Sequence, residues 1–386
     1  MRWIVTDDIY AETWRQLLEF ANFDLTKDVI ARRHGEPKSK KDHHNFTKQA
    51  SQARVCVLQA KEYFDAARET TLFTSPNHSY YGANALASLI MLVLGDGTMS
   101  LDYLRSDNKN KHHGLGFSTG CNAKSASSGL ELVENSRVEI LGFGHFFNLY
   151  KSLPAKGPVF ATAKRIHGST FTTNMQTVGE YKVPTIDTLV NTQKTLLELL
   201  KFLPDLNSEL QRFGITVNQS RSTHEVQYKD DVEHTHTWRI HECKTENELE
   251  KILEKFVVCA RLSDALDFQG SENARSGIVK LQFKPLQDYA FSWPNSRNTM
   301  NHDTISYADM PETHEITDLY LVAYQLSMLS RYFPDIWVGC IESQCRAAKL
   351  IERATDVIIK KLPILTLSIL CNQEIVISTH REPWKE

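Results

Sequence analysis

The most apolar stretch of the chain, residues 80–94, predicts a buried helix around which the fold is organised. Within residues 83–94 only Asn84 and Ser88 are polar, so a helix here has no face left for water. Twelve residues span about 18 Å, well short of the ~30 Å of a bilayer. Pro76 suits a first helical turn, where its missing N–H costs nothing. We therefore expect the central helix of a protein core.

Apolar positions at helical spacing predict further helices toward both ends of the chain. They cover residues 7–21, 46–68, 186–202, 206–213, 319–332 and 336–361, with a last helix opened by Pro363 and running to residue 375. A basic polar loop is expected over residues 32–44, and a long connection over residues 96–130. We expect the central helix to contact both the 46–68 helix and the 319–332 helix, so that both chain ends build one core.

Between these helices the pattern changes to the alternation typical of strands. Residues 223–228 and 233–243 predict a hairpin, and residues 278–283 and 138–141 predict two more strands. Thr245 and Glu248 form a capping signal for a helix over residues 246–256. The fold class expected is mostly α with an inserted small α/β segment and a helical core formed from both ends of the chain. The boundaries are 1–213 for the N-terminal helical region, 214–310 for the insert and 311–386 for the C-terminal helices.

Composition narrows the class of protein. A chain of 386 residues with 41% hydrophobic and 24% charged residues is globular and long enough for two or three structural units. The net charge of −3 excludes an overall basic footprint but allows a local basic patch. Seven scattered cysteines without a C-x-x-C pair indicate reduced thiols. With no signal-peptide core and no apolar run of 18 residues, we expect a cytoplasmic protein without membrane partners.

Three blocks of sequence carry a family resemblance. The first runs from Ala60–Phe64 through Tyr80–Leu86 to His113–Leu115; the second is Val138–Leu153, a strand followed by Gly-x-Phe-x-x-Leu; the third is Leu326–Trp337. Together they resemble the YaaC-like proteins of prokaryotes over residues 53–370, a resemblance that implies no established activity. The helical core is also similar to the HEPN superfamily of helical bundles, which includes metal-independent ribonucleases and non-catalytic binding modules.

The resemblance to HEPN proteins implies a motif to look for, Arg-x4–6-His. In those ribonucleases the arginine holds a phosphate and the histidine polarises the attacking 2′-hydroxyl. The chain holds two matches, Arg105 with His112 and Arg297 with His302. Chance placement of 19 Arg and 15 His gives about two such matches, so the motif alone decides nothing. Arg105 and His112 rank first, because they follow the central helix and adjoin the His-Gly-Leu block.

A histidine-rich hairpin is the strongest candidate for a metal site. His224, His234, His236 and His241 fall within 18 residues, and His234 and His236 share one strand face. Zinc requires three or four ligands in place, and His241 has the opposite parity. We predict no metal site and no cofactor, and exposed hairpin histidines instead.

The same hairpin offers the residues of a magnesium-dependent nuclease. Asp231 precedes Glu242-Cys243-Lys244, and an Asp followed by Glu-x-Lys on the next strand can bind Mg²⁺ and orient water. The intervening strand is too polar for the buried central strand that such enzymes use. A metal-dependent nuclease is therefore the remote alternative.

Two basic segments are the candidate nucleic-acid surface. Basic side chains beside flexible backbone suit phosphate contact, although solvated loops have the same composition. The residues are Lys38, Lys40, Lys41, Lys109, Lys111 and His113. Arg331, at the end of an apolar run, is expected to bond helix-end carbonyls or to pair with Asp335 one turn on.

The chemistry in the sequence favours binding over catalysis. We expect a non-catalytic helical binding or regulatory subunit of a prokaryotic multi-component system, with antiphage defence as its setting. Its partners would be proteins of a multi-subunit assembly and nucleic acid. The alternative is a HEPN-type metal-independent endoribonuclease.

Overall fold

A computed structural model describes most of the chain and divides it into two compact units. It describes residues 2–95, 100–153, 156–167, 170–182, 185–229, 233–241, 251–252, 267–271, 274–283, 296–300, 303–309 and 313–379. One unit, here called the helical unit, comprises Arg2–Leu153, Thr185–Lys201 and Ile316–Glu386; the other, the sheet unit, comprises Pro154–Pro184 and Phe202–Glu315. The segment 154–184, which we expected within the N-terminal helical region, thus groups with the strands.

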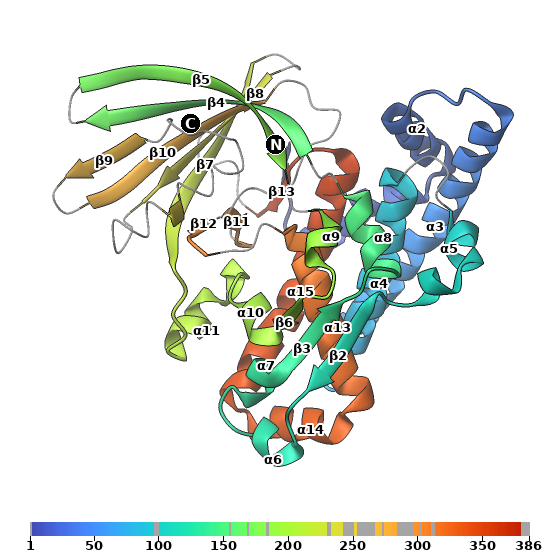
Figure 1. Cartoon of the computed structure of the whole chain (residues 1–386). Coiled ribbons are helices and arrows are strands. Elements are labelled where there is room, and N and C mark those ends of the chain that lie inside the picture. The colour runs from blue at the N-terminus through green and yellow to red at the C-terminus, as the bar shows by residue number, and fades with distance from the viewer. Residues whose placement is uncertain are drawn as a thin grey trace. The chain divides into compact units, whose positions relative to one another are not determined.

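The helical unit is organised around α4 (Ser75–Leu94), as the sequence predicts. Pro76 stands in its first turn, and from Gly82 to Leu94 no residue of the helix is exposed. α3 (Lys40–Glu69) precedes it, and the two lie side by side (Figure 1). Gly82 allows this closeness: a Cβ atom there would lie 2.7 Å from the ring of Phe64, far inside van der Waals contact.

Both ends of the chain complete the core of this unit. α13 (Glu315–Tyr332) contacts α4 through Tyr320, whose hydroxyl donates to Asn84 at 3.0 Å. α15 (Arg346–Cys371) packs on α4, and β1 (Arg2–Val5) pairs in parallel with β13 (Ile375–Ser378). The expectation that the central helix contacts both the preceding and the C-terminal helices is confirmed.

Smaller elements fill out the helical unit. They are α1 (Ile9–Leu17), the 3-10 helix η1 (Leu18–Ala21), α2 (Phe23–His34), α5 (Leu101–Ser106), the 3-10 helix η2 (Asn108–Lys111), α6 (Ala123–Ala126), α7 (Glu131–Asn135), α8 (His145–Ser152), α9 (Ile186–Leu189), α10 (Leu196–Leu200) and α14 (Pro334–Ser343). An antiparallel sheet has the order β2 (Leu115–Thr119), β3 (Ser136–Ile140), β6 (Gln193–Thr195). No helix among the described residues is both long and apolar enough to cross a membrane.

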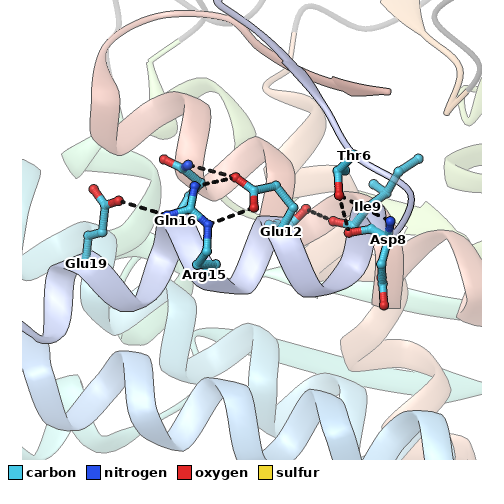
Figure 2. A network of polar contacts seen from close by, with 8 residues as sticks. Thr6, Asp8, Ile9, Glu12, Arg15, Gln16 and Glu19 are labelled. Atoms are coloured by element: carbon cyan, nitrogen blue, oxygen red, sulfur yellow. Dashed lines mark hydrogen bonds and ion pairs between the residues drawn. The ribbon is translucent and has the colours of Figure 1, made fainter. Parts of the chain in front are cut away.

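Helix α1 shows how local polar contacts fix an end segment (Figure 2). Its N-cap Asp8 accepts a hydrogen bond from the backbone N–H of Ala11 at 2.9 Å. Arg15 pairs with Glu12 at 2.7 Å, and Gln16 donates to the same carboxylate at 2.9 Å. Arg15 is therefore an exposed arginine whose charge is already compensated.

The sheet unit is built on antiparallel pairings. Its path runs β11 (Ser296–Asn298), β12 (Thr304–Tyr307), β7 (Gln219–Lys229), β8 (Glu233–Ile240), β10 (Ala274–Phe283), β4 (Lys156–His167) and β5 (Thr170–Lys182), with β9 (Asp267–Ser271) beside β10. The 3-10 helix η3 (Pro204–Leu206) and α11 (Asn207–Arg212) lie before β7 in the chain. The predicted hairpin and the strand at 278–283 are confirmed as β7–β8 and β10. The capping signal at Thr245 and Glu248 lies outside the described residues.

Across the described residues the fold is mostly α with a smaller strand component, and two of the expected helices differ in their bounds. The helix expected over 186–202 is wrong: Asn191 takes a positive φ of 62°, and Thr195 with Glu198 caps a new helix, α10. The helix expected over 336–361 is split at Gln344, with φ 51°, while Pro363 lies inside α15. The cysteines among the described residues are free.

The expected basic loop over residues 32–44 is largely helical. Arg32 and His34 belong to the last turn of α2, and Lys40 begins α3, capped by the side chain of Ser39. The long connection at 96–130 likewise holds α5, η2, β2 and α6. Polar composition concealed these elements because their stabilising contacts are caps and neighbouring helices rather than an apolar stripe.

Candidate functional site

A hydrogen-bonded cluster of tyrosines and histidines lies between α4, α13 and α8. At its centre is Tyr80, fully buried in α4. Its hydroxyl oxygen lies 2.8 Å from Nδ1 of His113 and 3.4 Å from the hydroxyl oxygen of Tyr320. The rings of His113, Tyr320 and Tyr324 each meet the ring of Tyr80 edge-on, with centroids 5.5, 5.7 and 5.5 Å away. The segment that holds His113 and helix α13 therefore converge on one tyrosine of α4.

The inner half of the cluster extends from Tyr320 to α8. The hydroxyl of Tyr320 donates to Oδ1 of Asn84 at 3.0 Å and lies 3.3 Å from Nδ1 of His145. The other ring nitrogen of His145 is 3.0 Å from Oγ of Ser88. Asn84 and Ser88 are the two polar residues of the apolar stretch in α4, and each has a partner here. Their presence in a core helix is thus explained by a buried network whose members satisfy one another.

Burial keeps this cluster uncharged at neutral pH. It raises the pKa of Tyr80 and Tyr320 far above the ordinary value of 10, and that of Tyr324 to about 12. Burial lowers the pKa of His145 to about 4. The pKa of His113 is lowered by burial first, then by the positive charge of Arg331. The cluster is a set of neutral hydrogen-bonding groups.

Two glycines fasten the His112–Gly114 segment to the start of α8. Gly114 and Gly144 have φ values of +79° and +92°, which other residues rarely adopt. A Cβ atom on Gly114 would lie 2.5 Å from the carbonyl oxygen of Phe143. The carbonyls of His112 and His113 accept hydrogen bonds from the first backbone N–H groups of α8, at 2.8 and 3.0 Å. This interlock positions the His113 ring against Tyr80.

Arg331 lies at the outer side of the cluster, in the last turn of α13. Its guanidinium carbon is 5.9 Å from the ring centroid of Tyr80, 5.5 Å from that of Tyr81 and 5.0 Å from that of Tyr332. Nε donates to the carbonyl of Ser327 at 3.3 Å, which confirms the expected bond to a helix-end carbonyl.

The other polar contacts of this guanidinium are weak or neutral. Nη1 donates to the hydroxyl of Tyr81 at 3.0 Å, and Nη2 lies 3.7 Å from Sδ of Met328. Among the described residues these are its partners, and none is a carboxylate; the expected pairing with Asp335 is not among them. Arg331 therefore carries a positive charge that no described side chain neutralises.

Arg105 and His112, the first ranked pair, have different partners in the structure. Arg105 is exposed on α5 and lies 3.9 Å from Asp102. His112 accepts a hydrogen bond from the N–H of Gly114 at 3.1 Å, and its ring meets Phe143. Among the described residues neither is a partner of the other.

The second pair is only partly described. Arg297 is buried in β11, where Nη1 donates to the carbonyl of Phe202 at 2.8 Å. His302 lies outside the described residues. A buried guanidinium bound to backbone serves the fold of the sheet unit.

The predicted basic residues fall into two groups. Lys38, Lys40 and Lys41 are exposed at the start of α3, while Lys109 and Lys111 are exposed on η2, just before His113. Tyr63, whose ring stacks on that of Tyr81, follows Lys41 by 22 residues of α3, about 33 Å along the helix. The first group is therefore remote from Arg331 along α3.

The hairpin residues considered for metal binding lie in the sheet unit. His224 is on β7, His234 and His236 are on β8, and His241 follows it, 2.6 Å from Oγ1 of Thr223. The side chains of the first three lie outside the described residues, as do Asp231 and Glu242. Where side chains are described, no three His, Cys, Asp or Glu residues form a group that could hold a metal ion.

The sequence pointed to His113 but not to its partners. These partners, Tyr80, Tyr320 and His145, lie in segments with apolar or family-like patterns. In such segments the sequence does not distinguish a tyrosine or histidine of a polar network from one that only packs in the core. A usable signal was the presence of Asn84 and Ser88, one turn apart in an otherwise apolar helix, because buried polar groups need partners.

Comparison with known proteins gives one match. No curated protein and no solved structure matches the chain. The family model described as YaaC-like Protein matches residues 19–370, which include every residue of the tyrosine–histidine cluster and Arg331. The chain belongs to the YaaC-like protein family.

Proposed function

We propose that this chain is a non-catalytic helical binding subunit of a prokaryotic multi-component system, and that it holds an anionic group of its ligand at Arg331 and His113. The observation that carries the proposal is the charge of Arg331, which lies among tyrosine rings without a carboxylate partner in the described residues. A guanidinium bonds anions such as phosphate strongly and directionally.

The hydrogen bonds around Tyr80 support binding over acid–base catalysis. Tyr320 gives its proton to Asn84, and the hydroxyl of Tyr80 is closer to Nδ1 of His113 than to Tyr320, at 2.8 against 3.4 Å. If Tyr80 donates to Nδ1, neutral His113 carries its own proton on Nε2. The nitrogen that could act as a base is then occupied. Nε2–H of His113 is a hydrogen-bond donor, and both His113 and Arg331 contact Tyr80. Two donors around one ring suit an anion.

The setting we propose, antiphage defence, is inferred from the family-like helical core and from no single residue. A HEPN-type ribonuclease is the second candidate, and the observation in its favour is that Arg331 and His113 flank one tyrosine. Such an enzyme needs its histidine free to accept a proton from the 2′-hydroxyl. In the tautomer proposed above, with Tyr80 donating to Nδ1 and the proton of His113 on Nε2, the imidazole has no free nitrogen for that role.

Calorimetric titration with pyrophosphate tests the proposed anion site. Wild-type protein should bind pyrophosphate, and Arg331→Gln should bind it at least tenfold more weakly, since a charged hydrogen bond contributes roughly 1.5–3 kcal/mol. Arg15→Gln is the matched control, because Arg15 is exposed but paired with Glu12, and it should leave affinity unchanged. Equal binding by wild type and Arg331→Gln, or no binding by wild type, would overturn the proposal.

A further inference from the structure

Exposed aromatic rings surround the charge of Arg331. Tyr332 is 62% exposed, Tyr81 38% and Tyr63 36%. The rings of Tyr63 and Tyr81 stack, with centroids 5.5 Å apart and planes inclined by 27°. Exposed aromatic rings leave apolar area in contact with water, which is unfavourable. Three such rings beside one cation therefore form an unusual surface. Its chemistry is both aromatic and positively charged.

The guanidinium retains hydrogen-bonding capacity after its internal contacts. Arginine has five N–H donors, and the structure engages one on Nε, one on Nη1 and, weakly, one on Nη2. At least two donors therefore remain for a ligand. The rings also hold the guanidinium in place through cation–π contact, which reduces the entropy lost on binding.

We infer that the anion site is a nucleotide site, in which Arg331 and His113 hold the phosphate and the exposed ring of Tyr332 or Tyr81 stacks on the base. This inference rests on the proposed function. A phosphate alone would leave the tyrosine faces in water, whereas every nucleobase has a flat face that stacks on tyrosine. Stacking on an aromatic side chain contributes roughly 1–3 kcal/mol per base.

A base linked to a phosphate occurs both in a free nucleotide and in each nucleotide of single-stranded RNA or DNA. Lys109 and Lys111 are exposed on η2, in the chain just before His113, and could contact neighbouring phosphates of a strand. The tests below therefore include both sources of a nucleoside phosphate.

The experiment compares ligands that contain or lack the base. AMP, adenosine, pyrophosphate and the tetranucleotide r(A)4 are titrated calorimetrically into the full-length protein. AMP or r(A)4 should bind at least tenfold more tightly than pyrophosphate. r(A)4 binding more tightly than AMP assigns the site to single strands, and the reverse assigns it to free nucleotide; either supports the inference.

The variants separate the base contact from the anion contact. Tyr332→Ala and Tyr332→Leu should weaken AMP about tenfold and pyrophosphate by a much smaller factor, because Tyr332 restrains the guanidinium but only a base can stack on its ring. The control is Tyr103→Ala on α5, since Tyr103 is 58% exposed, close to the 62% of Tyr332. Circular dichroism of each variant shows that it is folded.

Three outcomes overturn the inference. AMP binding no more tightly than pyrophosphate, with Tyr332→Ala without effect, removes the nucleotide and leaves the anion site standing. Tighter binding of phosphotyrosine than of AMP assigns the site to a phosphorylated protein. If wild type and Arg331→Gln bind every anion equally, or bind none, the proposed function is overturned as well.

Discussion

Tyr80 and Tyr320 lie 240 residues apart in the sequence, and their hydroxyl oxygens lie 3.4 Å apart in the core. Each comes from a helix at an opposite end of the chain, so the contact records how the two ends form one unit. Both hydroxyls are buried and both have further partners. The stability of the helical unit therefore depends on polar contacts as well as on apolar packing.

Tyr320→Phe tests the polar contacts. It removes the hydroxyl that donates to Asn84 and lies 3.3 Å from Nδ1 of His145, and leaves buried groups unpaired, at a cost of roughly 2–4 kcal/mol in the free energy of unfolding. Tyr324→Phe, the same change one turn later, removes one bond to the carbonyl of Leu115 and should cost about 1 kcal/mol. Urea denaturation measures both. Equal effects would show that the network contributes nothing beyond a single bond.

Leu89→Ala and Leu92→Ala test the central helix. Both side chains are fully buried in α4, and each substitution should leave a cavity that lowers the free energy of unfolding by roughly 2–5 kcal/mol. Leu58→Ala on α3 is the control, because that leucine is 43% exposed. A loss below about 1 kcal/mol at either core position would contradict the assignment of α4 as the centre of the core.

Gly114→Ala tests the interlock between the His112–Gly114 segment and α8. The substitution combines a positive φ with a Cβ atom 2.5 Å from the carbonyl of Phe143, and should cost more than 2 kcal/mol. Gly35 has a φ of +84° and a ψ of 162° with nothing within 4 Å, so Gly35→Ala measures backbone strain without a clash, roughly 1–3 kcal/mol, and should cost less than Gly114→Ala. Thermal unfolding of the two variants should differ clearly. Similar melting temperatures would mean that the close approach is not maintained in solution.

Acid should weaken the helical unit through His145. Its pKa is lowered to about 4 in the folded chain from an ordinary 6.5, so between these values the unfolded state binds more protons. The stability that His145 contributes is complete above pH 6.5 and is lost as pH falls toward 4, by at most about 3 kcal/mol. The lowered pKa of His113 acts in the same direction.

Urea midpoints measured from pH 7 to pH 4.5 check this. His145→Gln cannot titrate, and its midpoint should fall less than that of the wild type over the range. Parallel curves for the two proteins would show that His145 remains accessible to protons in the folded state.

RNA incubated with the protein in EDTA should remain intact. The matched variants are Arg105→Ala/His112→Ala, Arg297→Ala/His302→Ala and Arg331→Gln. Cleavage that one of these changes abolishes, and the others do not, would identify a ribonuclease site and end the non-catalytic proposal. Intact RNA with salt-dependent binding would agree with it, because phosphate contacts release counterions.

The core helices were predictable because their apolar residues recur at helical spacing or form runs that only a buried helix can accommodate. Residues 83–94 are almost wholly apolar, and the structure buries them as α4. The boundaries were harder, because they depend on tertiary contacts. Pro363 is a frequent helix breaker, yet it lies buried inside α15, where packing of the surrounding residues outweighs the lost backbone hydrogen bond.

The candidate site was less predictable than the fold, since its members meet only in space. The sequence gives no distance between Tyr80, His113 and Tyr320, and nothing in the order of residues pairs His145 with Ser88. Arg331 was expected to be a helix-end arginine, and its carbonyl bond agrees. What the pattern could not show is that its neighbours are tyrosines rather than an acid.

The assembly of one core from both chain ends has a consequence for synthesis on the ribosome. Tyr80 and Asn84 leave the ribosome with α4, but Tyr320 follows 240 residues later. At roughly 5–20 residues per second this interval is about 12–48 s. During it α4 lacks the contacts that α13 and α15 make with it in the folded unit. The core of the helical unit can therefore close only after α13 has been made, and a product that ends before Arg331 would lack the proposed anion site.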